Sequence, residues 1–121
     1  MDCIFCKIIN NEIPSYTIYE DDYVKCFLDI NPLEVGHTLI VPKKHFVDNS
    51  DIDDEYLIKI HNASKVVIGK ISTKLKPTGY KIVQNNGFLQ DVKHYHVHII
   101  PSYNRKKTNK KVEDIYTLLT K

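Results

Sequence analysis

Three histidines near the end of the chain, His94, His96 and His98, alternate with other residues. Side chains of a β-strand point alternately to its two faces, so a strand here would place the three imidazoles on one face, about 7 Å apart. Tyr95 and Val97 would point to the opposite face. Neutral imidazole is both a metal ligand and a nucleophile toward phosphorus near neutral pH. The spacing therefore predicts either a metal site or nucleophilic catalysis.

Polar residues elsewhere in the sequence favour chemistry at phosphate, with a metal nearby. His37 follows Gly36 at the start of an expected strand, from which it can reach the same site. Asn85 and Gln90 lie in the loop before the histidines and offer neutral hydrogen bonds. The sequence contains neither a Walker-type glycine loop nor a carboxylate cluster suited to two magnesium ions. Imidazole is therefore the favoured reactive group.

Cys3 and Cys6 form a Cys-x-x-Cys pair, which alone is compatible with redox chemistry, zinc binding or chance. A thioredoxin-like role needs a βαβ context, and the pattern around the pair lacks it. Zinc takes four Cys or His ligands, so the pair is half of a site and the other ligands must come from elsewhere in the fold. Cys26 lies in an apolar run and is expected to be buried.

The order of hydrophobic patterns predicts an α+β domain in which an antiparallel sheet carries helices on one side. Apolar residues recur every three or four positions over 53–75, as in a helix with one buried face. Runs of β-branched and aromatic residues between turns are typical of strands. The expected elements are a short helix over 4–10, strands over 16–20, 23–28 and 38–41, the long helix over 53–75, strands over 80–83 and 94–100, and a short helix over 112–119.

Composition limits the classes of function. With 121 residues, 42% hydrophobic and 26% charged, the chain fits one globular domain over 1–121. A net charge of +2 gives no argument for binding nucleic acid or a membrane surface. The basic residues over 105–111 are expected to belong to a solvated extension over 104–121. Without a membrane-length apolar run or a secretory leader, the expected compartment is the cytoplasm, where cysteines stay reduced.

The segment 94–100, His-Tyr-His-Val-His-Ile-Ile, resembles the His-φ-His-φ-His-φ-φ motif that defines the histidine-triad family. Residues 3–9 and 12–14 resemble the amino terminus of its Hint branch, in the bacterial-type, zinc-containing form. Residues 27–32 and 36–45 resemble its central strands. The similarity covers about residues 3–103 and implies an antiparallel sheet of about five strands, one long helix and a short N-terminal helix.

The resemblance implies a purine nucleoside phosphoramidase or a related nucleotide hydrolase. His96 would attack the α-phosphorus and form a nucleotidyl-histidine that water then hydrolyses. His98 would hold the phosphate, with His37 beside it, and Asp29 would accept hydrogen bonds from the ribose hydroxyls. Other interpretations are a dinucleoside polyphosphate hydrolase, a nucleotide-binding regulatory protein with little turnover, and a zinc-stabilised interaction module.

The remaining assignments also follow from the resemblance. Apolar residues would enclose a purine base, although each of them is equally compatible with core packing: Ile4, Phe5, Ile8, Phe27 and Ile30. Asn85, Gln90 and Asp91 would lie near the phosphate. Cys3, Cys6, His45 and His94 would hold a structural zinc ion. Relatives of this type form homodimers, for which the long helix over 53–75 offers a surface.

Asp91 is the clearest departure from the family pattern. The family carries serine or threonine at this position, after a glycine-rich loop that is shorter here. A carboxylate would repel a phosphate if ionised, or protonate a leaving group if its pKa were raised. We expect Asp91→Ser to raise the turnover of a simple nucleoside phosphoramidate.

Overall fold

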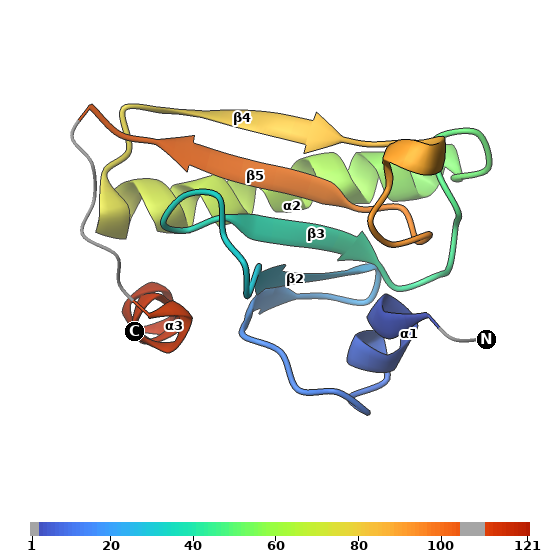
Figure 1. Cartoon of the computed structure of the whole chain (residues 1–121), viewed down its shortest axis with the longest axis horizontal. Coiled ribbons are helices and arrows are strands. Elements are labelled where there is room, and N and C mark those ends of the chain that lie inside the picture. Colours follow the sequence, from blue (N-terminus) through green and yellow to red (C-terminus); the bar gives the residue numbers. More distant parts are fainter. Residues whose placement is uncertain (1–2, 105–110) are drawn as a thin grey trace.

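The computed structural model describes residues 3–104 and 111–121 (Figure 1). Its elements are α1 (Ile4–Ile9), β1 (Thr17–Glu20), β2 (Val24–Leu28), β3 (Thr38–Pro42), α2 (Asp54–Leu75), β4 (Gly79–Gln84), the short 3-10 helix η1 (Gly87–Leu89), β5 (Val97–Ser102) and α3 (Val112–Thr120). The α+β class, the five-stranded antiparallel sheet and the long and short helices agree with the sequence prediction. Among the described residues, none of the helices combines the length and the hydropathy of a membrane span.

The sheet has the strand order β1-β2-β3-β5-β4, and every neighbouring pair is antiparallel. Ile40 of β3 is paired with Cys26 of β2 on one side and with Val97 of β5 on the other. The strand that carries His98 therefore lies inside the sheet. β4 forms one edge and is hydrogen-bonded to β5 alone.

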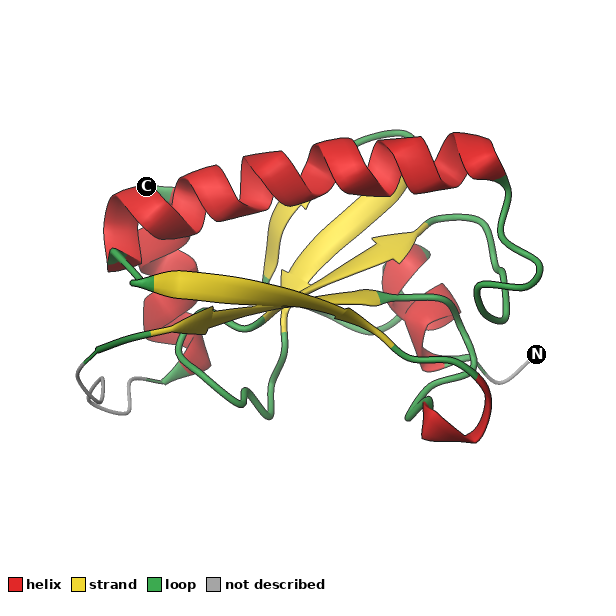
Figure 2. Ribbon diagram, turned by 90° about the horizontal axis from the view of Figure 1, so that it is seen from above, coloured by secondary structure: helices red, strands yellow, loops and turns green. Residues whose placement is uncertain are grey.

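The long helix α2 covers one face of the sheet (Figure 2). Its apolar face, which includes Val67 and Ile71, packs on Cys26 and Ile40 in a single buried cluster. The C-terminal helix α3 adds Ile115 to the same cluster. Of the predicted basic extension over 104–121, residues 105–110 lie outside the described residues, but the helix expected over 112–119 is part of this core.

The opposite face of the sheet is covered by α1, so the prediction of helices on one side is wrong. Phe5 and Ile8 of α1 pack on Phe27, Leu39 and Val41 in a second buried cluster. The reason is visible in the burial of β2 and β3, in which all five residues of each strand are buried. A strand that is apolar on both faces needs cover on both sides.

A buried lysine holds α1 on this face. The Lys25 side chain is 3% exposed, and its ammonium donates hydrogen bonds to the Ile8 carbonyl at 3.0 Å and to Oδ1 of Asn11 at 2.9 Å. Carbonyls at the end of a helix lack partners within the helix, and a cation there is favourable. Lys25 thus ties the end of α1 to β2.

The histidine strand begins later than predicted, at Val97 instead of residue 94. The ladder between β3 and β5 ends at the pair Ile40–Val97, and Pro42 has no N–H with which to extend it. The N–H of Tyr95 instead donates to the carbonyl of Phe46 at 2.7 Å. The predicted alternation nevertheless persists, because Tyr95, Val97 and Ile99 all lie in the cluster under α2.

Candidate functional site

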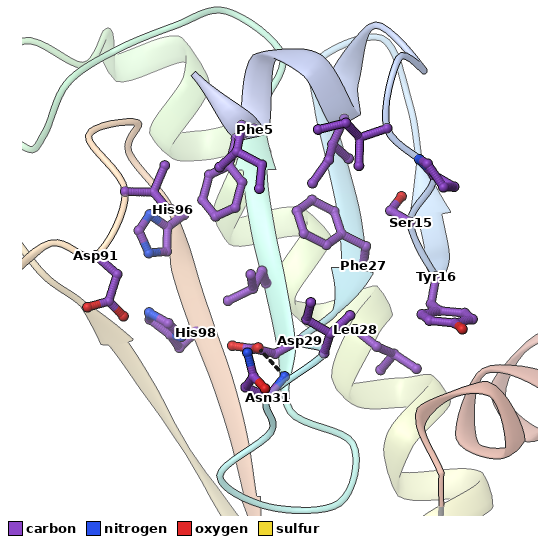
Figure 3. Close-up of a pocket in the computed structure, with 17 residues that line it drawn as sticks. Phe5, Ser15, Tyr16, Phe27, Leu28, Asp29, Asn31, Asp91, His96 and His98 are labelled. Atoms are coloured by element: carbon purple, nitrogen blue, oxygen red, sulfur yellow. Dashed lines mark hydrogen bonds between the residues drawn. The ribbon is translucent and has the colours of Figure 1, made fainter. Parts of the chain in front are cut away.

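A cavity of about 300 Å³ lies between α1, the end of β2 and the segment that leads into β5 (Figure 3). Most of its wall is apolar and comes from α1 and β2. Its imidazoles and carboxylates, from His96, His98, Asp29 and Asp91, gather at one side, whereas the hydroxyl groups of Ser15 and Tyr16 lie at the other side (Figure 3). The cavity therefore joins an apolar compartment to a group of imidazoles and carboxylates.

Most residues predicted to bind nucleotide or act in catalysis line this cavity: Ile4, Phe5, Ile8, Phe27, Asp29, Ile30, Asp91, His96 and His98. Asn85 and Gln90 are not in the lining. The Gln90 side chain is buried, and its amide nitrogen donates to the Val47 carbonyl at 2.7 Å. Contact of Asn85 or Gln90 with a substrate remains a prediction.

The cavity lining also contains residues that the sequence reasoning did not find. They are the segment after α1, residues 13–16, together with Leu28, Asn31, Leu39 and Val92. Residues 13–15 belong to none of the helices or strands that the sequence predicts, and residue 16 begins a predicted strand, so no local pattern assigns them to a site. Their position beside Phe27 results from how α1 and β1 pack on β2.

His96 is held in one tautomer. Its Nδ1 lies 2.7 Å from the carbonyl oxygen of His94, an acceptor, so Nδ1 carries the proton and donates it. Nε2 then keeps its lone pair. The His96 side chain is 3% exposed, and the ring of Phe5 meets it edge to face at 5.0 Å between centroids. This arrangement leaves an oriented, unprotonated nitrogen at the cavity wall.

His37 and His98 form a second oriented pair. The N–H of Leu33 donates to Nδ1 of His37 at 3.1 Å, so His37 carries its proton on Nε2. That Nε2 lies 2.9 Å from Nδ1 of His98 and donates to it, which places the His98 proton on Nε2. His37 lies behind His98, outside the cavity lining, and orients it toward the site.

Burial keeps these imidazoles neutral. It lowers the pKa of His37 and that of His96, and it lowers the pKa of His98 to about 4, with a further contribution from the neighbouring His96 and His37. Asp29 opposes the shift in all three cases. At pH 7 the site therefore presents neutral nitrogens, which is the form required of an imidazole nucleophile.

The structure brings Cys3, Cys6, His45 and His94 together, with one ligand atom of each within 4.8 Å of the others. Nδ1 of His94 lies 3.4 Å from the Cys3 sulfur, 3.6 Å from the Cys6 sulfur and 3.0 Å from Nδ1 of His45. A tetrahedral zinc ion separates sulfur and nitrogen ligands by roughly 3.3 to 3.8 Å, as follows from its bond lengths. The distances from His94 to the two sulfurs lie in this range, and the nitrogen–nitrogen distance of 3.0 Å is slightly shorter. The four residues therefore fit a Cys₂His₂ centre.

The contacts around these residues prepare them as ligands. Nε2 of His94 lies 2.9 Å from the Pro42 carbonyl and donates to it, so Nδ1 has its lone pair directed at the cysteines. Burial and the contact with Cys3 raise the pKa of the Cys6 thiol to about 11. Since a bound metal requires the thiolate, a cation here would supply the charge that ionises the thiol.

The chain is similar to proteins of one known family. The HIT domain family model matches residues 10–105. An uncharacterized HIT-like protein of Methanocaldococcus jannaschii is 50% identical over 103 residues, which cover 84% of this chain and 79% of that protein. The adenosine 5'-monophosphoramidase HNT1 of Saccharomyces cerevisiae is 42% identical over 106 residues, covering 86% of this chain and 65% of the yeast protein.

One solved structure with the same fold contains zinc. It is a Zn-bound histidine triad family protein from Mycobacterium smegmatis, with a TM-score of 0.90 and 31% identity. The match covers 99% of this chain and 91% of that one. Almost every described residue therefore has a counterpart in a fold that has been observed with zinc bound.

Proposed function

This chain belongs to the HIT domain family, and we propose that it hydrolyses purine nucleoside phosphoramidates through a nucleotidyl-histidine intermediate. The observation that carries the proposal is the free Nε2 of His96 at the wall of a cavity large enough for part of a nucleotide. The activity of the related yeast enzyme, named as an adenosine 5'-monophosphoramidase, supports the class of substrate.

The cavity suggests how a nucleotide lies. The base occupies the apolar compartment, where Phe5 and Phe27 meet edge to face at 5.7 Å between centroids. Asp29, at the end of β2, accepts hydrogen bonds from the ribose hydroxyls with the carboxylate oxygen that is not bonded to the Asn31 N–H. The α-phosphorus then lies beside His96 and His98, the only residue pair in the described lining with imidazole nitrogens.

Two displacements complete the reaction. In the first, the Nε2 lone pair of His96 forms a bond to phosphorus, the phosphorus–nitrogen bond of the substrate breaks, and the leaving amine takes up one proton from solvent. In the second, water attacks phosphorus, the bond to Nε2 breaks, and the attacking water gives up one proton to solvent. The Nε2 proton of His98, oriented by His37, donates a hydrogen bond to a phosphoryl oxygen and stabilises the charge on it in both steps.

The experiment that tests this proposal traps the intermediate. An adenosine phosphoramidate labelled in the nucleotide is mixed with the protein, quenched at alkaline pH, where phosphohistidine bonds survive, and digested for mass spectrometry. We expect a mass increase equal to one nucleotidyl group on the peptide that contains His96. An adduct on any other residue contradicts the mechanism, and turnover without an adduct favours direct attack by water.

We also propose that Cys3, Cys6, His45 and His94 hold a structural zinc ion. Zinc supplies no step of the reaction in this proposal; it fixes the backbone around His94. The His94 carbonyl is the acceptor that sets the His96 tautomer, so the ligand residue and the nucleophile are linked by one hydrogen bond of 2.7 Å. The metal therefore acts on catalysis through position.

Finally, we propose a homodimer that uses the free edge of the sheet. β4 has a hydrogen-bonding partner on one side only, and its residues Tyr80 and Ile82 are 48% and 53% exposed. On α2, Ile58 is 62% exposed. An unpaired edge strand flanked by exposed apolar side chains is suited to pairing with a second copy.

Light scattering after gel filtration tests this interface. We expect the unmodified protein to elute as a dimer and Ile82→Lys to elute as a monomer, because pairing would then bury a lysine charge on the edge strand of each copy. Leu33→Lys is the matched control: Leu33 is 70% exposed but lies in the loop between β2 and β3, so the dimer should persist. A monomeric unmodified protein contradicts the proposal.

A further inference from the structure

The cavity has an unusual charge for a site that would take a phosphate. Its only charged residues among the described lining are two carboxylates, Asp29 and Asp91, and no lysine or arginine of the described chain takes part. Lys93, two residues after Asp91, does not line the cavity; its ammonium donates to the carbonyl of Gly87. The site therefore presents negative charge and neutral imidazoles to its ligand.

The two carboxylates lie at different points along the cavity. Figure 3 shows Asp91 beside His96 and His98, on the side away from Phe27 and Tyr16. The charge of Asp91 also opposes the lowering of the pKa of His96 and of His98 by burial, as expected of a near neighbour. With the base beside Phe27 and the phosphorus at His96, the group on the far side of phosphorus extends toward Asp91.

The end of the cavity around Asp91 is thus the place of the leaving group. Asp91 is exposed, in contrast to the histidines that it approaches, so its carboxylate faces solvent as well as the cavity. An exposed carboxylate in this position attracts a cation and repels an anion on the departing group.

We propose that Asp91 is a specificity-determining residue that selects nucleoside phosphoramidates whose leaving amine carries a second, positively charged group. This inference rests on the proposed function, since it assigns the leaving-group end of the same site. The reaction is unchanged: the phosphorus–nitrogen bond breaks, and the amine departs with its cationic group intact. Dinucleoside polyphosphates, whose leaving group is a polyanion, are disfavoured for the same reason.

Three adenosine 5'-phosphoramidates of equal chain length test the proposal, made from 1,4-diaminobutane, 4-aminobutanol and 4-aminobutyrate. Their free ends are an ammonium, a hydroxyl and a carboxylate. We expect kcat/KM to be about three to five times higher for the ammonium than for the hydroxyl compound, and lower again by a similar factor for the carboxylate, as for other partly solvated ion pairs. High salt should reduce these ratios by screening.

Asp91→Asn keeps the shape of the side chain and removes its charge, so the three substrates should become equal to within about twofold, the size of a screened exposed interaction. Asp91→Ser should equalise them as well, and should raise turnover of the hydroxyl compound by removing repulsion of the phosphate. Asp22→Asn is the matched control, since Asp22 is exposed in the turn between β1 and β2 and lies outside the cavity. It should retain the preference.

The outcomes separate the two proposals. Equal rates in the unmodified protein, or a preference that persists in both Asp91 variants, overturn the role of Asp91 and leave the hydrolase intact. Absence of turnover for all three substrates, together with absence of a nucleotidyl adduct, overturns the proposed function and this inference with it. A preference that disappears only in the Asp91 variants supports both.

Discussion

Replacing His96 with glycine should lower kcat/KM for an adenosine phosphoramidate by about 10⁴- to 10⁶-fold, the range observed when an enzyme loses its nucleophile or a residue that supports it. Binding of AMP should change little, because the apolar compartment and Asp29 remain. The reason is the single free nitrogen: His96 alone has its Nε2 lone pair uncommitted at the cavity wall, whereas His98 carries its proton on Nε2. Steady-state kinetic assays measure kcat/KM, and isothermal titration calorimetry measures the affinity for AMP.

The glycine variant permits a sharper test than loss of activity. It leaves a space beside Phe5, and free imidazole in solution can enter it and attack phosphorus in place of the missing ring. Partial recovery of turnover with imidazole, without a covalent protein adduct, is the expected result. His61→Ala is the control, since His61 is exposed on α2. Retention of most activity in the His96 variant would rule out nucleophilic catalysis by this residue.

The reactive residues of the site could be predicted from the sequence more completely than the shape of the cavity. Alternation of His94, His96 and His98 with Tyr95 and Val97 predicts which side chains share a face, and the buried cluster under α2 confirms it for the non-histidine positions. This inference depends only on local backbone geometry. Where local geometry decides, a single sequence is sufficient.

The features of the fold that the sequence did not predict depend on long-range packing. The position of α1 opposite α2 follows from the burial of both faces of β2 and β3, and no pattern within residues 4–10 indicates which face the helix covers. The start of the last strand at Val97 depends on Pro42 in another strand. The prediction that Cys3 and Cys6 lie beside His94 came from a family resemblance. The spacing of the two cysteines alone did not identify the other two ligands of a zinc site.

The role of Gln90 was also not predictable from local sequence. Its side chain is buried, and its Oε1 has no hydrogen-bond partner among the described residues. The sequence places a neutral amide before the histidines, where it suits phosphate binding. In the structure the amide nitrogen is used by the Val47 carbonyl, so Gln90 braces the loop that carries Asp91 against the segment after β3. A residue type with several hydrogen-bonding options gives little information about which option the fold selects.

Removal of the metal should have the second large effect. We expect the protein as purified to contain one zinc ion per chain, and Cys6→Ser to contain much less, because loss of one of four ligands weakens a tetrahedral site steeply. Metal that binds only the folded state stabilises it by about 4 kcal/mol at a thousandfold excess over Kd, so chelation should lower Tm by about 10 °C or more. Calorimetry and elemental analysis measure both quantities without reference to activity.

The effect on catalysis should follow from the geometry that joins the two sites. Cys3 caps α1 and Cys6 lies within it, so both are fixed to the helix that carries Phe5 into the cavity wall, and the His94 carbonyl holds His96. Loss of zinc should therefore weaken AMP binding as well as slow the reaction. Cys26→Ala is the matched control, since Cys26 is buried under α2 on the other face of the sheet and should keep both zinc and nucleotide affinity. Equal AMP affinity with and without zinc would contradict this prediction. It would mean that the metal stabilises only the position of α1 and does not influence nucleotide binding.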